Sequence, residues 1–379
     1  MTPTTTAATG TYLPSLTGLR AVAALGIFCF HAALLGCADR SPPGPLVAMG
    51  PPCMSFFFVL SGYLLARSAR PAGLEPRAVF WRRRLTRLYP VHLVLTVIVV
   101  AGLAFAVPAA AGTALASALP SVFLVQAWLP DFRYVLGGNG SSWPLACEVF
   151  FYALFPVLWA AVDKVPRSLL LPAAGCAAAA TWAVAALAHA VAPGGAPLPQ
   201  APFTVSQAQL WAVYSFPPAR LPEFVLGMLL TRLPRTGRAS RIGVGTATAV
   251  LGVTVVAGWY LLPQVFCLAA TTVVPVALLI HAATAADLKG RPSYPRASPM
   301  LFLGRISHPF CQGHSLLVAS LYLTFGTALP VLTAAAALPL AVAFAWLLHR
   351  YVEQPCARRL SPARRGTARP ALDRSESGK

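Results

Sequence analysis

Runs of apolar residues, each long enough to cross a bilayer, alternate with short polar segments from Leu13 to the neighbourhood of His349. A spanning helix needs roughly 20 predominantly apolar residues, because it must cross about 30 Å of hydrocarbon. The pattern therefore predicts an all-α integral membrane protein, a bundle of about ten transmembrane helices. The expected spans are residues 14–36, 50–67, 86–107, 143–162, 168–191, 210–231, 242–261, 264–285, 300–324 and 328–349.

Basic residues fall in alternate polar segments, and this gives the spans a direction. Arg and Lys gather in the segments that start near Arg67, Lys164, Arg232 and Lys289, whereas the intervening joints carry almost none. Cytoplasmic loops of membrane proteins carry an excess of Lys and Arg. Ten spans with the N-terminus inside satisfy every one of these assignments, so both termini are expected to be cytoplasmic.

The Ala-rich stretch at 108–129 is apolar enough to suggest an eleventh crossing. Counting it would move the basic segment with Lys164 and Arg167 to the outside, against the distribution of positive charge found in membrane proteins. We therefore interpret this stretch as an outer re-entrant or interfacial segment.

The composition, 57% hydrophobic and 10% charged, supports a multi-pass protein of the cell membrane, since roughly a quarter of residues are charged in soluble domains. One membrane domain is expected at 13–360, between an N-terminus (1–12) and a basic C-terminal tail (361–379) that are both expected to be disordered. The first apolar stretch carries Arg20 and lacks a small-residue cleavage site, so a retained helix is expected. The net charge of +19 does not indicate nucleic-acid binding, because the basic residues are spread over many joints.

Neither a disulfide scaffold nor a metal site is indicated by the cysteines. Cys29, Cys176 and Cys267 lie within apolar stretches, where a thiol packs as a small hydrophobe. Cys37 and Cys53 flank the first outer loop, and a bridge between them in an oxidising exterior stays open. No Cys or His spacing resembles a zinc site, and no glycine pattern is typical of nucleotide binding.

Two ionisable residues, Arg20 and His31, lie in the first span. At about 100° per residue they share one face of a helix, about 16 Å apart along its axis. An arginine near the surface can bind phosphate, and a buried imidazole can accept a proton from a hydroxyl group. The spacing is equally consistent with a surface anchor at Arg20 and a polar packing residue at His31.

A dense arginine cluster lies in the sequence FWRRRLTRLYP from Phe80 to Pro90. Arg84 and Arg87 are one helical turn apart, so their guanidinium groups point the same way, and Arg83 precedes them. Such a cluster suits a polyphosphate, although any one of these arginines can also serve only to orient the helix.

Glu148 is the lone acid in the long apolar segment that opens at Trp143. A carboxyl group there is expected to be protonated or paired, and His31 is a candidate partner. A carboxylate that orients a histidine is a familiar arrangement in general-base catalysis, but an ordinary interhelical hydrogen bond is equally consistent. Glu223 and His314 are further candidates of the same kind.

Together these segments resemble the membrane-bound acyltransferase family 3, whose members move acyl groups from coenzyme A to hydroxyl groups of sugars, polymers or natural products. The resemblance covers residues 13–360 and is specific because its motifs occur in order. The matching segments are Leu16 to His31 with its Arg-x10-His pattern, FFFVLSGYLL from Phe56, FWRRRLTRLYP, Trp143-x-Leu-x2-Glu148, RLPEFVLGMLL from Arg220, LGRIS from Leu303, and Tyr351 to Pro355.

The resemblance implies roles for these residues. Arg20 and His31 match the catalytic pair, and Glu148 matches the acidic position. His31 would take the proton of the acceptor hydroxyl as it attacks the thioester, with Glu148 fixing the imidazole and no metal taking part. Acyl-coenzyme A, the co-substrate, would bind from the cytoplasm at Arg83, Arg84 and Arg87. Trp143, Glu223 and His314 are assigned to the acceptor side.

The chain also departs from the family pattern. After Gly-Arg-Ile-Ser it has HPFCQGH, with Pro309 inside the expected helix and Gly313 where the family usually has Trp. Pro144 replaces the usual Ser or Thr after Trp143. A reshaped acceptor pocket is therefore expected, and the role of His314 stays open.

The acceptor class is a weaker inference. No hydrolase-like domain follows the last helix, which favours a small molecule such as a macrolide-type natural product over a surface polysaccharide or glycolipid. The rival interpretation is a multi-spanning transporter in which Arg20, His31 and Glu148 relay protons. Transporters often contain internal repeats, and the two halves of this sequence show no convincing similarity. Acyl chain length, the side of acceptor entry and oligomeric state stay open.

Overall fold

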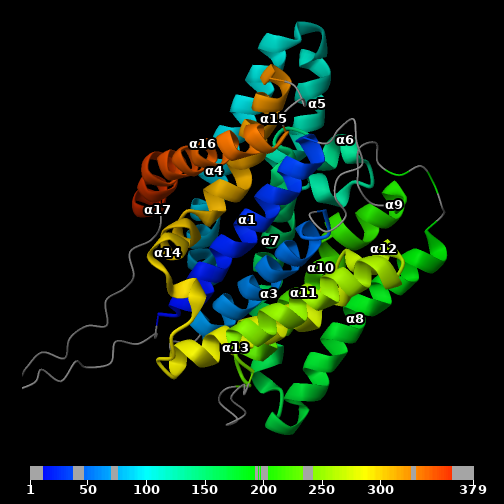
Figure 1. Ribbon diagram of the computed structural model, residues 1–379, viewed down its shortest axis with the longest axis vertical. Helices are drawn as coiled ribbons and strands as arrows, with labels where there is room; N and C mark the ends of the chain where they lie inside the picture. The colour runs from blue at the N-terminus through cyan, green and yellow to red at the C-terminus, as the bar shows by residue number, and fades with distance from the viewer. Residues whose placement is uncertain are drawn as a thin grey trace, which may run out of the picture.

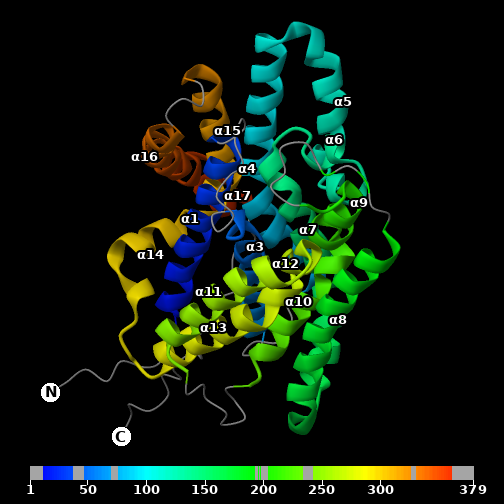
Figure 2. The same ribbon diagram turned by 45° about the vertical axis from the view of Figure 1, so that its right-hand side comes forward.

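The computed structural model describes residues 12–36, 47–69, 76–192, 195, 197, 204–233, 242–325 and 330–360. Within these residues the chain is helical, apart from one isolated bridge between Pro197 and Ser206 (Figures 1 and 2). The ends expected to be disordered and Cys37, one half of the possible disulfide, lie outside the described residues.

The longer helices are α1 (Pro14–Gly36), α3 (Gly50–Ala69), α4 (Arg77–Ala106), α5 (Ala111–Val122), α7 (Trp143–Lys164), α8 (Leu170–Val191), α10 (Pro217–Leu230), α11 (Val244–Leu261), α13 (Ala270–Leu288), α14 (Ser298–Arg305), α15 (Ser307–Phe325) and α16 (Pro330–Leu348). Short helical segments join them: η1 (Pro108–Ala110), η2 (Gln126–Trp128), α6 (Phe132–Val135), η3 (Gly140–Ser142), η4 (Arg167–Leu169), α9 (Gln207–Leu210), η5 (Trp211–Ser215), α12 (Gln264–Cys267), η7 (Tyr294–Arg296), η8 (His349–Glu353) and α17 (Gln354–Leu360).

Eight helical segments of the described chain are long and apolar enough to cross a membrane, which confirms the all-α, multi-pass architecture. They contain α1, α3, α4, α7, α8, α11, α13 and α16. Two of the expected spans, 210–231 and 300–324, are instead broken helices. The first breaks at Phe216, before Pro217 starts α10. A proline disfavours helical backbone geometry at the residue that precedes it. The second breaks at Ile306, between α14 and α15.

The Ala-rich stretch after α4 forms α5, a helix of 12 residues and therefore about 18 Å long. This is too short to cross about 30 Å of hydrocarbon. α5 runs back beside the end of α4, and the pair projects from the rest of the molecule (Figures 1 and 2). The stretch is thus helical without adding an eleventh crossing of its own.

The centre of the molecule is the crossing of α3 and α10, where two glycines meet backbone. A Cβ atom on Gly62 would overlap the carbonyl oxygen of Phe224, and a Cβ atom on Gly227 would overlap that of Val59. Small residues at helix crossings allow such close packing in membrane proteins. α1, α7, α13 and α8 pack around this crossing, which places the polar faces of α1 and α7 toward the interior.

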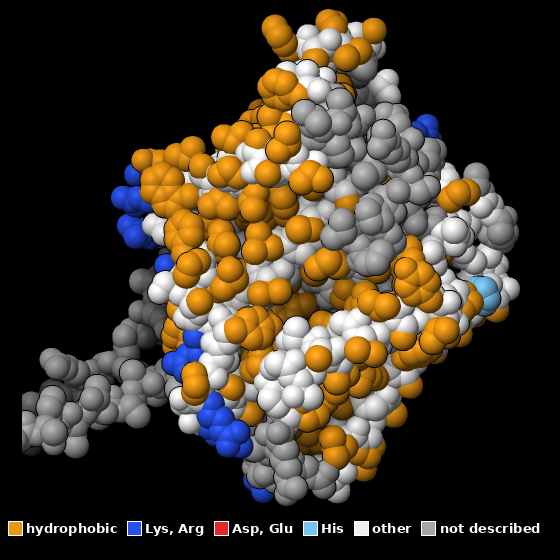
Figure 3. Space-filling model, in the orientation of Figure 1, with side chains coloured by type: hydrophobic (Ala, Val, Ile, Leu, Met, Phe, Trp, Pro, Cys, Tyr) orange, Lys and Arg blue, Asp and Glu red, His pale blue; other side chains and the backbone are white. Residues whose placement is uncertain are grey.

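The periphery is apolar. Hydrophobic side chains cover most of the described surface in Figure 3, and Lys and Arg gather near its edge. Exposed Leu, Val and aromatic side chains are frequent on α8, α11 and α16. Such a surface suits contact with lipid, since the transfer of apolar side chains from water to hydrocarbon is favourable.

Candidate active site

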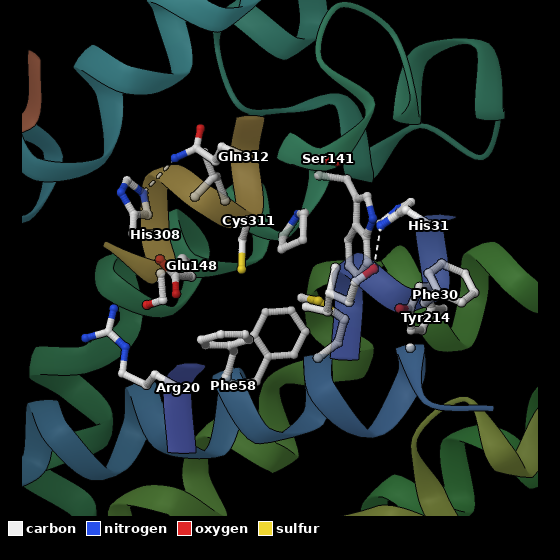
Figure 4. A pocket seen from close by; sticks show the side chains of 18 residues that line it. Arg20, Phe30, His31, Phe58, Ser141, Glu148, Tyr214, His308, Cys311 and Gln312 are labelled. Atoms are coloured by element: carbon white, nitrogen blue, oxygen red, sulfur yellow. Dashed lines mark hydrogen bonds between the residues drawn. The ribbon is translucent and has the colours of Figure 1, made fainter. Parts of the chain in front are cut away.

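A cavity lies among α1, α3, α7, η5 and α15 (Figure 4). Four residues expected at the site line it: Arg20, His31, Trp143 and Glu148. Two helices far apart in sequence, α1 and α7, therefore bring these side chains to one space. Much of the remaining wall is aromatic and comes from Phe30, Phe57, Phe58 and Tyr214.

His31 pairs with His314 inside the protein. His31 Nδ1 lies 3.0 Å from His314 Nε2 and 3.1 Å from the carbonyl oxygen of Ile27. His314 Nδ1 lies 2.9 Å from the carbonyl oxygen of Phe310. A carbonyl oxygen can only accept, so Nδ1 of each ring carries the proton. The single hydrogen on His31 Nδ1 is therefore shared between the carbonyl oxygen of Ile27 and His314 Nε2, and His31 Nε2 keeps its lone pair.

Aromatic rings hold this histidine pair in place. The ring of Phe310 stacks on His314 with centroids 5.5 Å apart, and Phe30 meets His31 edge-on at 4.9 Å. His314 itself is 1% exposed. The sequence departures at α15 fit this packing: Pro309 lies in the first turn, where its missing N–H costs little, and a Cβ atom on Gly313 would come 3.1 Å from the ring of Phe344.

Glu148 lies elsewhere in the same cavity. It accepts a hydrogen bond of 3.1 Å from the hydroxyl group of Tyr152, one turn further along α7. Figure 4 places Glu148 near Arg20 and His308 at one end, with His31 at the other. The partner of His31 in this structure is therefore His314 and not Glu148, and Glu148 shares its end of the cavity with Arg20.

A second cavity adjoins the first. Arg84 and Arg87 of α4 line it, together with Tyr152 of α7. Four residues line both cavities and mark where they meet: Arg20, Phe57, Glu148 and His308. The arginine pair of α4 and the histidine of α1 thus line two adjoining cavities with a shared wall, and these two cavities together are called the path below. Arg83, which was expected beside them, lines neither cavity.

The turn after α16 fixes one of these arginines. Glu353, 3% exposed, accepts from Arg87 Nε at 3.1 Å and from His349 Nδ1 at 2.8 Å. Glu353 lies in η8, a π-helical turn, and such turns occur frequently at functional sites. Glu353, the acid of the motif Tyr351 to Pro355, therefore orients Arg87 in the wall of the second cavity.

Glu223, which was expected on the acceptor side, does not line the cavity. It forms an ion pair of 3.0 Å with Arg220, and both side chains are 0% exposed. Arg220 also donates to the carbonyl oxygen of Leu268 and to Ser55 Oγ. Its guanidinium group lies over Phe58, 5.1 Å from the ring centre. The pair therefore supports the aromatic wall from behind.

Two further polar residues of α15 face the path and were not anticipated. His308 and Gln312 line the first cavity and are joined by a hydrogen bond of 2.7 Å (Figure 4). Among the described residues, no group of three or more His, Cys, Asp or Glu side chains is placed to hold a metal ion. The polar groups on the path thus include histidines, arginines, the amide of Gln312, the carboxyl group of Glu148 and several hydroxyl groups.

Residues 13–350 match the model of a family described as an acyltransferase domain. The chain is 35% identical over 374 residues to acyltransferase MdmB of Streptomyces mycarofaciens, covering 93% of each protein. It is 29% identical over 158 residues to O-acetyltransferase OatA of Staphylococcus aureus, and over 157 residues to peptidoglycan O-acetyltransferase OatA of Listeria monocytogenes. These matches cover 39% and 38% of this chain and 24% of each relative. No solved structure matches.

Proposed function

The chain belongs to acyltransferase family 3, and from the geometry of its cavities we propose that it moves an acyl group from acyl-coenzyme A to a hydroxyl group of a small molecule. The proposal rests on one observation, the two adjoining cavities that place Arg84 and Arg87 at one end and His31 at the other. A charged end followed by an aromatic end suits a donor that carries phosphates at one end and a thioester at the other.

The donor's phosphates bind at the arginine end. Arg84 and Arg87 supply positive charge there, and charge-assisted contacts with phosphate are the strongest hydrogen bonds that a protein forms. Arg20 lies where the cavities meet, on the same face of α1 as His31 and about 16 Å from it along the axis. The extended arm of coenzyme A then runs past Arg20 and brings the thioester to His31.

His31 Nε2 is the general base. It removes the proton of the acceptor hydroxyl while the oxygen attacks the thioester carbonyl. The tetrahedral intermediate collapses, the carbon–sulfur bond breaks, and the coenzyme A thiolate takes up the proton that His31 received. An ester and free coenzyme A result. Base catalysis of this kind is worth typically about 10² to 10⁴ in rate.

The membrane orientation follows from the same assignment. Coenzyme A is cytoplasmic, so the end of α4 that carries Arg84 and Arg87 faces the cytoplasm, in keeping with the basic segment from Arg67 to Arg87. Both termini are then cytoplasmic, with the broken helices at 210–231 and 300–324 completing ten crossings. Broken helices at membrane depth are tolerated where they line a cavity, and both of these do.

The acceptor is a natural product of macrolide type or a similar small molecule. Phe30, Phe57, Phe58, Trp143 and Tyr214 give the cavity near His31 a largely aromatic wall, which suits an apolar ring system that bears a few hydroxyl groups. A surface glycan or glycolipid is the second candidate, favoured by the local match to the peptidoglycan O-acetyltransferase.

Product analysis tests the function. Purified protein in detergent is incubated with acetyl-, propionyl- or longer acyl-coenzyme A and with hydroxylated macrolides or glycan fragments, and products are identified by mass. We expect an acceptor ester and free coenzyme A with at least one macrolide. No product with any donor, together with no protection of the protein by coenzyme A against heating, would instead support proton-coupled transport through Arg20, His31 and Glu148.

A separate prediction concerns Arg84. The Arg84→Ala variant should raise KM for acyl-coenzyme A at least about tenfold, because a charged hydrogen bond is worth about 1.5–3 kcal/mol. KM for the corresponding acyl-pantetheine, which lacks phosphates, should not change. Arg77, exposed at the start of α4, gives the matched control Arg77→Ala. An equal rise in KM for both donors would place the phosphates elsewhere.

A further inference from the structure

His314 forms a hydrogen bond with His31, the proposed base, but does not line the cavity. It lies behind His31, with 1% of its surface exposed, and it does not line either cavity. A direct contact with the acceptor, the role expected from sequence, is therefore not what its position provides. Its side chain instead contacts His31, the proposed base, at the Nδ1 edge of the imidazole ring.

The hydrogen bonds around the pair fix the protons on both rings. Phe310 and Ile27 present carbonyl oxygens to Nδ1 of His314 and of His31, at 2.9 Å and 3.1 Å. Each Nδ1 therefore carries hydrogen, which leaves His314 Nε2 as an acceptor 3.0 Å from His31 Nδ1. The result is a directed chain in which His31 shares its Nδ1 hydrogen between Ile27 and His314, and His314 donates to Phe310.

We propose that His314 is the positioning residue of the catalytic base: by accepting from His31 Nδ1–H alongside the carbonyl oxygen of Ile27, it orients His31 in the tautomer whose Nε2 lone pair takes the acceptor's proton. This inference rests on the proposed function. In many hydrolases a carboxylate occupies this position and fixes the tautomer of the histidine. Here a neutral imidazole occupies it, and the available carboxylate, Glu148, is bonded to Tyr152 instead.

The hydrogen bond to His314 also stabilises the positive charge that His31 gains during the reaction. When His31 Nε2 receives the proton, the ring becomes an imidazolium whose Nδ1–H donates to His314 more strongly, because hydrogen bonds from charged donors are roughly twice as strong as neutral ones. The proton stays on His31 until the leaving thiolate takes it. His314 changes neither its protonation nor its partner Phe310.

The test compares two replacements that differ in one property. His314→Leu removes the acceptor, whereas His314→Gln can still accept through its amide oxygen. We expect kcat of His314→Leu to fall about 10²-fold, within the range for losing an oriented base, with KM for acyl-coenzyme A unchanged. His314→Gln should keep kcat within about tenfold of the wild type. Ser320→Ala, an exposed change on the same helix, is the control and should be fully active.

The possible results distinguish the positioning role of His314 from the proposed acyl-transfer activity. Wild-type kcat in His314→Leu, or an equal loss in the Gln and Leu variants, would overturn the positioning role while leaving the acyltransferase intact. An increase in KM for the acceptor without a change in kcat would also overturn it, since that result marks a binding residue. Absence of turnover in the wild type would instead count against the proposed function. Unchanged melting temperatures in detergent establish that each variant is folded.

Discussion

The His31→Ala variant should lose acyl transfer by about 10² to 10⁴ in kcat and remain folded. The side chain lines the cavity, so its removal enlarges a space that already exists and leaves the helix packing of α1 in place. KM for acyl-coenzyme A should change little, because the phosphates bind at the other end of the path.

Initial rates of ester formation measure this effect directly. His189, exposed at the end of α8, supplies the matched control His189→Ala, which should behave as the wild type. Residual activity in His31→Ala is expected to rise with pH, since hydroxide can replace a missing base. A variant with the full wild-type rate would remove His31 from the chemistry.

The second large effect is on stability. Glu223→Leu should destabilise the protein by about 3–5 kcal/mol, the usual cost of leaving one partner of a buried ion pair uncompensated. Arg220 has 0% exposed side-chain surface and cannot reach water when Glu223 is gone. Heating in detergent followed by size-exclusion chromatography measures the loss of folded protein.

A paired replacement separates the ion pair from simple packing. The double variant Arg220→Met with Glu223→Leu removes both charges and should recover much of the lost stability, because apolar replacement of a buried pair is often neutral. If the single variant melts at the wild-type temperature, or if the double variant is the less stable of the two, Glu223 is not held by Arg220 in the way described.

The sequence was most informative where hydrophobicity is the whole signal. Long apolar runs become long helices in lipid because every backbone group must be satisfied internally, and α1, α3, α4, α7, α8, α11, α13 and α16 follow from this alone. The breaks at Phe216 and Ile306 depend on local backbone geometry and packing within otherwise apolar segments. Hydropathy averages over a window and does not register such breaks.

The part of the site that lies on a single helix could be predicted from the sequence. Arg20 and His31 share a face of α1, and the cavity lies on that face. Contacts between helices were not predictable in the same way. Glu148 and His314 were both polar candidates opposite His31, and only the packing of α15 on α1 determines that His314 reaches the imidazole.

Two ion pairs were not anticipated from the sequence, for related reasons. Glu223 is a polar residue in an apolar segment, but its cation, Arg220, lies three positions earlier on the same helix, so the pair satisfies itself without a ligand. The acid of the closing motif, Glu353, could have been linked to the arginine cluster, since a buried carboxylate needs a cation. Its partner Arg87 is far away in sequence, and no spacing rule connects them.

The central claim is that a hydroxyl acceptor and acyl-coenzyme A react on this protein. The most direct measurement is the release of free coenzyme A from labelled acyl-coenzyme A by purified protein, followed as a function of acceptor concentration. The account predicts release that rises with acceptor and equals the amount of labelled ester formed. Release that is absent, or that is unaffected by acceptor and yields only the free acid, would contradict it.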